Sequence, residues 1–317
     1  MEDLQKLRIV FMGTPAFAVA SLEALCKAGF QIVGVITAPD KPAGRGLQEQ
    51  SSAVKKYAIE KGLPLLQPVK LKDPDFLQSL DNWKADLQVV VAFRMLPEVV
   101  WSRPRLGTIN LHGSLLPQYR GAAPINWAII DGNTQTGLTT FLLQHEIDTG
   151  QILKSTPIDI GPDETAGELH DKMKEIGADL LVKTIVGWVN KTITPTAQAE
   201  LTPTLTPLRQ APKLTRELSL IDWNQSVQTI HNLVRGLSPS PGAYTYLQEK
   251  VLKILRAKPG ETALRLAPGQ WASDGKTFLR FGCAEGILEI LLLQLEGKKV
   301  MSTEEFLRGY RILEKKS

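Results

Sequence analysis

Asn110, His112 and Asp148 have residue types and a spacing that could do chemistry on a carbonyl group. Asn110 and His112 are two residues apart at the end of an apolar run, and such residues of a strand point to the same face. An amide N–H can stabilise an oxyanion, and an imidazole can accept or deliver a proton. The pair alone is a weak signal, because a histidine at a strand end is more often structural.

Asp148 strengthens the signal from the Asn-x-His pair. It lies in Glu146–Gly150, a predicted turn before another strand, and follows His112 by 36 residues. That length is enough for a crossover that returns to the same edge of a sheet. A carboxylate beside a histidine would orient the ring and favour its charged form. We therefore expect all three side chains at the carboxyl edge of the sheet, where open α/β sheets bind ligands.

The first half of the chain alternates strand and helix signals, which predicts a doubly wound, mostly parallel, Rossmann-like α/β sheet. The expected strands are Leu7–Met12, Ile32–Thr37, Leu87–Ala92 and Thr108–Leu111, followed by the adjacent pair Thr136–Leu143 and Gln151–Ile158. Helices are expected to begin with Thr14 as N-cap before Pro15, at Ser52, at Asp73-Pro74, near Pro124, and at the capping box Thr165–Glu168.

A second domain is predicted after a segment rich in Thr and Pro, Lys191–Pro212. We expect a catalytic domain at 1–190, a linker at 191–208 and a C-terminal domain at 209–317. Strand signals dominate the last part, which predicts a small, OB-like β-barrel. The expected strands are Val251–Ala257, Thr277–Phe281 and Gly286–Leu295, before a final helix that opens at Ser302.

Composition narrows the class of protein. The chain has 317 residues, 43% of them hydrophobic, and no apolar run reaches the ~18 residues of a membrane span. Its acidic N-terminus lacks the basic region of a secretory signal, so we expect a cytoplasmic protein. Cys26 and Cys283 read as free thiols in a reducing compartment, and the histidines show no metal-ligand spacing, so no metal is expected.

Charge is unevenly spread along the chain. Residues 1–208 hold 20 Lys and Arg against 22 Asp and Glu, whereas residues 209–317 hold 17 against 11. The first part therefore carries −2 and the second +6. A basic C-terminal part could bind a polyanion, although a solvated surface with a mild excess of charge has the same composition.

The segment Asn110–Pro117 (NLHGSLLP), with RGAAPI at Arg120–Ile125 and IDTG at Ile147–Gly150, resembles the signature of the folate-dependent formyltransferases. The resemblance covers nearly the whole chain, and it also includes Phe11–Pro15, Pro39–Gly46, Ile221–Trp223, Ser238–Ala243 and Gly297–Met301. Each piece is weak by itself, but the combination is specific.

The resemblance implies 10-formyltetrahydrofolate as formyl donor and the α-amine of methionine on initiator tRNA as acceptor. Asn110 would donate to the oxyanion, His112 would help there or protonate the departing folate nitrogen, and Asp148 would hold His112 charged. The expected folate-binding residues are Ser114, Leu115, Leu116, Pro117, Phe93, Arg94, Met95 and Leu96. At two of them, Phe93 and Arg94, the family usually has Tyr and Gly.

The loop 38–50 carries cations and glycines with almost no apolar side chain, which is also typical of a surface loop without a binding role. The resemblance implies that this loop grips the acceptor end of the tRNA. The expected tRNA-binding residues are Lys41, Gly44, Arg45 and Gly46 in the loop, and Arg235, Lys298 and Lys299 in the C-terminal domain. We expect a monomer.

Other functions stay open from the sequence. A formyltransferase could act on a small amine, either a purine-pathway ribonucleotide amine or an amino sugar nucleotide. A ribonucleotide enzyme would want a phosphate-binding loop after the first strand, where Gly13–Ala16 offers little. A 10-formyltetrahydrofolate hydrolase could use the same Asn–His–Asp set. A nucleotide-binding or RNA-binding protein without chemistry is the remaining alternative, but neither G-x-G-x-x-G nor a P-loop follows the first strand.

Overall fold

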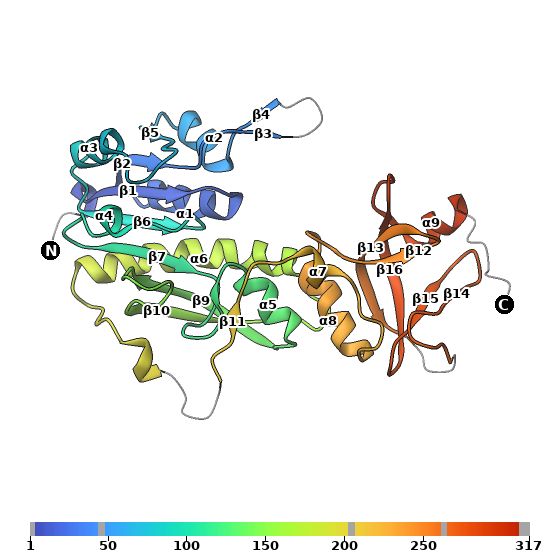
Figure 1. The fold of residues 1–317 in the computed structure, drawn as a ribbon. Helices are drawn as coiled ribbons and strands as arrows, with labels where there is room; N and C mark the ends of the chain where they lie inside the picture. Colours follow the sequence, from blue (N-terminus) through green and yellow to red (C-terminus); the bar gives the residue numbers. More distant parts are fainter. Residues whose placement is uncertain (1–3, 44–47, 202–206, 261–264, 311–317) are drawn as a thin grey trace. The chain divides into compact units, whose positions relative to one another are not determined.

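The computed structural model describes residues 4–43, 48–201, 207–260 and 265–310 (Figure 1). The chain forms two compact units. Unit 1 comprises Met1–Gly121, Gly137–Ile158 and His170–Gln210, and unit 2 comprises Ala122–Thr136, Asp159–Leu169 and Ala211–Ser317. The predicted boundary at residues 191–208 stays a prediction.

Unit 1 is built on a seven-stranded sheet with the order β10-β9-β7-β6-β1-β2-β5. The strands are β1 (Arg8–Gly13), β2 (Gln31–Ile36), β5 (Leu65–Leu66), β6 (Leu87–Val91), β7 (Thr108–His112), β9 (Gln135–Leu142) and β10 (Ile152–Asp159). The pairs β1–β2, β1–β6, β6–β7 and β2–β5 are parallel, and β7 and β9 are antiparallel. In Figure 1 the arrows of β1, β6 and β7 run in one direction. The predicted mostly parallel α/β sheet is confirmed.

The central strands are buried on both faces, as expected where helices cover a parallel sheet. Every residue of β6 is buried, and Ile9, Val10, Phe11 and Met12 of β1 are fully buried. The helices are η1 (Leu4–Lys6), α1 (Ala16–Lys27), α2 (Ala53–Glu60), α3 (Pro74–Asn82), α4 (Glu98–Trp101), α6 (Ala166–Val189) and η2 (Gln198–Leu201).

The helices that the sequence predicts begin where they were expected, with one exception. The predicted helix starts at Ser52 and Asp73 are confirmed, and the side chains of both residues accept backbone N–H groups of the first turn. The reciprocal bonds of the capping box between Thr165 and Glu168 are also present. The prediction of Thr14 as the N-cap of α1 was wrong. Pro15 takes the N-cap position with extended backbone (ψ 174°), and no side chain caps the helix.

Unit 2 contains a six-stranded antiparallel sheet with the order β12-β13-β16-β15-β14, in which β17 also pairs with β16. The strands are β12 (Ala243–Leu247), β13 (Lys250–Pro259), β14 (Trp271–Ser273), β15 (Leu279–Gly282), β16 (Ile287–Leu295) and β17 (Met301–Ser302). The predicted small β domain is confirmed. As far as the described strands show, its sheet is an open half-barrel.

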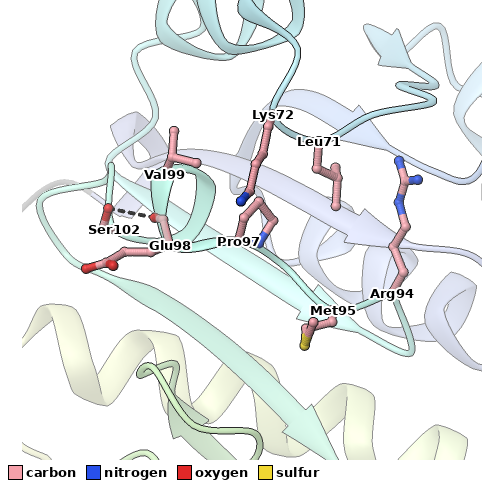
Figure 2. Close-up of a pocket in the computed structure, with 8 residues that line it drawn as sticks. All are labelled: Leu71, Lys72, Arg94, Met95, Pro97, Glu98, Val99 and Ser102. Carbon is pink, nitrogen blue, oxygen red and sulfur yellow. Dashed lines mark hydrogen bonds between the residues drawn. The ribbon is translucent and has the colours of Figure 1, made fainter.

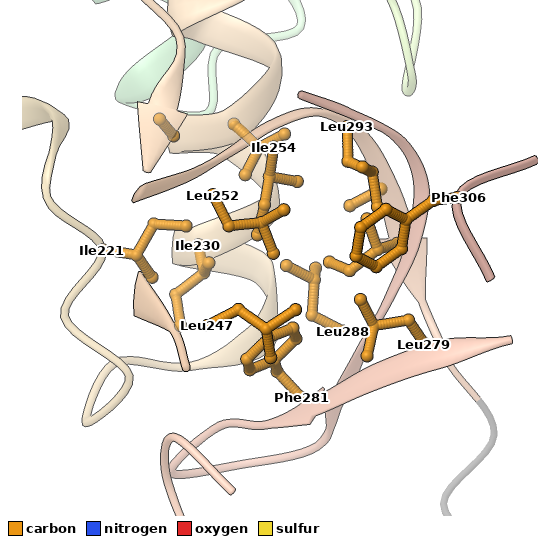
Figure 3. Packing of buried hydrophobic residues seen from close by; sticks show 14 of the residues in the cluster. Ile221, Ile230, Leu247, Leu252, Ile254, Leu279, Phe281, Leu288, Leu293 and Phe306 are labelled. Carbon is orange, nitrogen blue, oxygen red and sulfur yellow. The ribbon is translucent and has the colours of Figure 1, made fainter. Parts of the chain in front are cut away.

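The core of unit 2 gathers apolar side chains of the sheet with one face of a helix (Figure 3). This helix, α8 (Val227–Leu237), was not predicted; its Ile230, Val234 and Leu237 recur at helical spacing and are buried. The other helices here are α5 (Pro124–Ile130), α7 (Arg216–Ser219) and α9 (Thr303–Gly309). The predicted helix start at Ser302 is confirmed by a complete capping box.

Four short strands lie outside these two sheets. They are β3 (Lys41–Ala43), β4 (Gln48–Gln50), β8 (Arg120–Gly121) and β11 (Gln210–Ala211). β3 and β4 form an antiparallel pair inside the segment that the sequence predicts as a loop. None of the helices described is long and apolar enough to cross a membrane.

Candidate functional site

Asn110 and His112 lie at the carboxyl end of β7, the strand at which the parallel part of the sheet meets the antiparallel strand β9. Asn110 pairs with Val90 of β6 on one side and with Phe141 of β9 on the other. Its side chain is half-buried, whereas the other residues of β7 are buried. Because alternate residues of a strand share a face, the amide of Asn110 and the ring of His112 project to one side of the sheet.

The two ring nitrogens of His112 face different acceptors. Nε2 lies 2.9 Å from the carbonyl oxygen of Tyr119, which can only accept, so Nε2 carries a hydrogen and donates it. Nδ1 lies 3.8 Å from Oδ2 of Asp148. Both side chains are nearly buried, with exposed fractions of 8% and 11%. The structure therefore brings together the histidine and the carboxylate that the sequence pairs only by spacing.

Asp148 occupies a tight turn. Its backbone has φ 55°, a left-handed conformation that Asp adopts more readily than most residues. Its Oδ2 accepts the backbone N–H of Gly121 at 3.0 Å. This bond directs the carboxylate toward the segment that follows His112, so the turn and the strand end form one site.

Gly150 ends the same turn, and only glycine fits there. A Cβ at this position would lie 1.6 Å from the carbonyl oxygen of Leu142, a backbone atom that cannot move aside. Gly150→Ala is expected to lower the free energy of unfolding by about 1–3 kcal/mol or more. Chemical denaturation would measure it. Gly309→Ala, where a Cβ meets nothing within 4 Å, is the control, and equal stabilities of the two variants would contradict this account.

The loop Ser114–Pro117 after β7 is held by hydrogen bonds to Gln118 and to Thr139 of β9. The Ser114 hydroxyl donates to the carbonyl of Gln118 at 2.6 Å. The Thr139 hydroxyl donates to the Ser114 carbonyl at 2.7 Å and accepts the Leu116 N–H at 3.1 Å. Ser114, Leu116 and Pro117 are buried, and Leu115 is half-buried. Their contact with folate stays a prediction.

The loop after β6 divides its predicted folate-binding residues between the interior and the surface. Phe93 and Leu96 pack with the apolar cluster beneath the sheet. Met95 is 75% exposed. Arg94 donates to the carbonyl oxygens of Pro68 and Val69, and burial lowers the pKa of its guanidinium. Arg94 thus anchors this loop to the neighbouring one.

An open cavity of about 790 Å³ lies beside this loop, and the residues that line it are drawn in Figure 2. Its lining consists of Leu71, Lys72, Arg94, Met95, Pro97, Glu98, Val99 and Ser102. The lining combines apolar side chains with two cations, Lys72 and Arg94, and one carboxylate, Glu98. Within the described residues, no group of three or more His, Cys, Asp or Glu side chains could hold a metal ion.

Residues 7–185 match the family model for formyl transferase, and residues 213–311 match the model for its C-terminal domain. The chain belongs to the formyl transferase family. This finding confirms the resemblance seen in the signature around Asn110–Pro117.

Among the relatives of this formyl transferase is the methionyl-tRNA formyltransferase of Bacteroides thetaiotaomicron, 50% identical over 313 residues, or 97% of each chain. That of Flavobacterium johnsoniae is 48% identical over 310 residues, covering 96% of this chain and 97% of the relative.

Solved structures share the fold. A sugar 3N-formyl transferase, WlaRD, has a TM-score of 0.65 at 19% identity, covering 92% of this chain and 99% of its own. HypX from Aquifex aeolicus in complex with tetrahydrofolic acid has a TM-score of 0.65 at 18% identity, covering 95% and 47%. At these identities the likeness concerns the fold alone.

The residues of this formyl transferase that were predicted to contact tRNA have different placements. Lys41 belongs to β3, and Gly44, Arg45 and Gly46 lie outside the described residues. Lys298 and Lys299 are exposed between β16 and β17.

Arg235 is only 6% exposed, and its guanidinium donates to Asn232 at 3.0 Å and to the carbonyls of Gly161 and Glu164 at 3.3 and 3.4 Å. The sequence predicts Arg235 as a tRNA-binding residue. Because the guanidinium is committed to acceptors inside unit 2, we leave Arg235 out of the proposed tRNA-binding surface.

Three residues near the site were not singled out from the sequence. Tyr119 supplies the carbonyl that accepts a hydrogen bond from His112. Gln198 binds the turn of Asp148, and Arg120 binds Gln198. Arg120 was quoted only as part of the family signature. Gln198 fell within the predicted linker, where no periodicity or charge pattern marks it.

Proposed function

We propose that this protein transfers a formyl group from 10-formyltetrahydrofolate to the α-amino group of methionine on initiator tRNA. The observation that carries the proposal is the 50% identity, over 97% of both chains, to a methionyl-tRNA formyltransferase. The arrangement of Asn110, His112 and Asp148 supports the same chemistry. The proposed acceptor places the reaction in the cytoplasm, and we propose that the protein acts as a monomer.

The reaction moves a formyl group between two nitrogen atoms. The neutral amine attacks the formyl carbon, and the electron pair of the C=O bond moves onto oxygen. Collapse of this oxyanion breaks the bond to the folate nitrogen, which takes up a proton while the new amide nitrogen loses one. The amide N–H of Asn110 is the proposed donor to the oxyanion, and a donor of this kind contributes about 100- to 1000-fold in rate.

His112 is the proposed proton carrier, and its geometry selects Nδ1 as the atom involved. Nε2 is held by the Tyr119 carbonyl at 2.9 Å, whereas Nδ1 faces Asp148 at 3.8 Å, longer than a direct hydrogen bond. A ring that carries both protons would direct one N–H toward each acceptor. A water molecule between Nδ1 and Asp148 could relay the proton.

The proposed folate-binding loops follow β6 and β7, which are parallel neighbours, so both loops leave the sheet at its carboxyl edge. The exposed Met95 and the open cavity beside it supply apolar surface for an aromatic ligand. Lys72 supplies a cation for a carboxylate. These features fit a folate.

Arg45 is the cation in the β3–β4 segment on which we base a test of tRNA binding. Arg45→Ala is expected to raise the KM for charged tRNA, because loss of one phosphate contact releases one counterion less. The slope of log KM against log salt concentration should decrease by about 1. Steady-state formylation at several salt concentrations would measure both. Lys84→Ala, at an exposed cation between α3 and β6, is the control. An unchanged KM would favour a loop without a binding role.

An acceptor panel tests the proposed function itself. The protein is mixed with 10-formyltetrahydrofolate and, in turn, methionyl-initiator tRNA, glycinamide ribonucleotide, an amino sugar nucleotide or water alone. We expect formyl transfer to the tRNA. Transfer to one of the small amines, or formate release at the same rate without an amine, would replace the proposal by one of its alternatives.

A further inference from the structure

Gln198 reaches the turn of Asp148 from a distant part of the chain. It begins η2 and is 4% exposed. Its Nε2 donates to the carbonyl oxygen of Asp148 at 2.8 Å and to that of Gly150 at 2.9 Å. One side-chain amide therefore binds both ends of the turn that carries the site's carboxylate.

Arg120 fixes the orientation of this amide. Its Nε and Nη2 donate to Oε1 of Gln198 at 3.1 and 2.6 Å. A guanidinium can only donate and a carbonyl can only accept, so the amide oxygen must face Arg120 and the nitrogen must face the turn. The amide has a single orientation that satisfies every one of these contacts.

The residue after Arg120 contacts the carboxylate of Asp148 directly. Gly121, which follows Arg120, donates its backbone N–H to Oδ2 of Asp148 at 3.0 Å. Gln198 thus binds the backbone of the turn, and Gly121 binds the side chain of Asp148. Arg120 connects these two contacts, because it binds Gln198 and precedes Gly121 in the chain. Asp148 has a left-handed backbone (φ 55°), so these contacts also select a conformation that costs free energy when unsupported.

We propose that Gln198, oriented by Arg120, is a positioning residue that sets the carboxylate of Asp148 against Nδ1 of His112. The inference rests on the proposed function, because it assigns Asp148 its catalytic role. Neither residue touches the reacting atoms in this account. A displacement of about 1 Å at a reacting group can cost about 100-fold in rate. Loss of the contact between Gln198 and the turn of Asp148 is therefore expected to lower kcat.

The test compares Gln198→Leu with Gln88→Leu in steady-state formylation of charged initiator tRNA. Both substitutions remove a buried amide from unit 1, but Gln88 lies near the start of β6 and bonds Thr108 instead of the Asp148 turn. We expect kcat to fall about 10- to 100-fold for Gln198→Leu, with KM for tRNA unchanged, and to stay within about twofold for Gln88→Leu. Equal loss of kcat in both variants would overturn the proposal.

A second comparison separates positioning from folding. In an Asp148→Asn background, Gln198→Leu should lower kcat no further, because the charge that it positions is already gone. An equal fold-loss in both backgrounds would overturn the proposal. If Gln198→Leu does not fold, Arg120→Lys replaces it, since lysine keeps the charge but cannot offer the paired bonds to Oε1. Arg120→Lys should lower kcat in the Asp148 background alone.

The proposed function fails separately from this inference. If the wild-type protein transfers no formyl group to charged tRNA, the function is wrong whatever the variants do. If the wild-type protein does transfer it and Gln198→Leu keeps the wild-type kcat, only the positioning role is wrong.

Discussion

His112→Ala is expected to lower kcat for formyl transfer to charged initiator tRNA by about 100- to 10,000-fold. The ring is buried between the Tyr119 carbonyl and Asp148, and the proposed mechanism assigns the proton transfer to this ring. Binding of the folate donor should change little, because the ring is assigned to the transition state and not to ground-state binding. Rapid-quench single-turnover rates with saturating enzyme would measure the chemical step.

A histidine away from the site provides the control for His112→Ala. His170 lies on α6, is half-buried, and packs its ring against Phe17. His170→Ala should leave the single-turnover rate within about twofold, the range expected of a surface substitution. A single-turnover rate for His112→Ala equal to that of His170→Ala would remove His112 from the chemistry.

Asn110→Ala is expected to lower kcat by about 100- to 1000-fold. The amide lies on the same face of β7 as His112 and is the proposed donor to the oxygen that gains charge. Since that donor acts in the transition state, kcat and kcat/KM should fall together while KM stays nearly constant. Steady-state kinetics with varied folate and varied tRNA would separate the two parameters.

Asn110→Asp sharpens the test of the oxyanion role. The side chain keeps its size, but an ionised carboxylate offers no N–H and repels a developing oxyanion. Its kcat should be no higher than that of Asn110→Ala. Asn82→Ala, in an exposed position on α3, is the matched control. Recovery of wild-type kcat by Asn110→Asp would contradict an oxyanion donor at this position.

Much of the site's framework could be predicted from local sequence. The alternation of strands and helices fixed the sheet type, and the i, i+2 relation placed Asn110 and His112 on one face. The approach of Asp148 to His112 could not be predicted in this way. The sequence showed only that the chain between the two residues is long enough to allow it. It depends on β9 returning antiparallel beside β7, a tertiary pairing that the local pattern does not contain.

Two contacts that hold the site, those of Tyr119 and Gln198, are not marked by any pattern in the local sequence. Tyr119 holds His112 through its backbone carbonyl, from a turn in which Tyr119 itself has φ 59°. Any residue type offers a carbonyl, so the sequence does not mark this contact. Gln198 falls in a Thr- and Pro-rich stretch whose composition indicates a linker, yet its amide is buried against the site turn.

The burial of a charged side chain also could not be predicted from the sequence. Arg235 was counted with the basic surface because arginine is usually exposed. Its three backbone and side-chain acceptors come from Asn232, Gly161 and Glu164, and two of these are more than 70 residues away. The excess of +6 in residues 209–317 therefore overstates the cations available to a polyanion.

The central claim is that the Asn110–His112–Asp148 site moves formyl to the amine of methionine on tRNA. One competition experiment tests it directly. Isotope-labelled 10-formyltetrahydrofolate is offered to a mixture of methionyl-initiator tRNA and an amino sugar nucleotide, with either the wild-type protein or Asp148→Asn, and the label on each acceptor is followed in time. The account predicts label on methionine with the wild-type protein and a rate lower by at least about 100-fold with Asp148→Asn. Label on the sugar nucleotide, or equal rates for the two proteins, would contradict it.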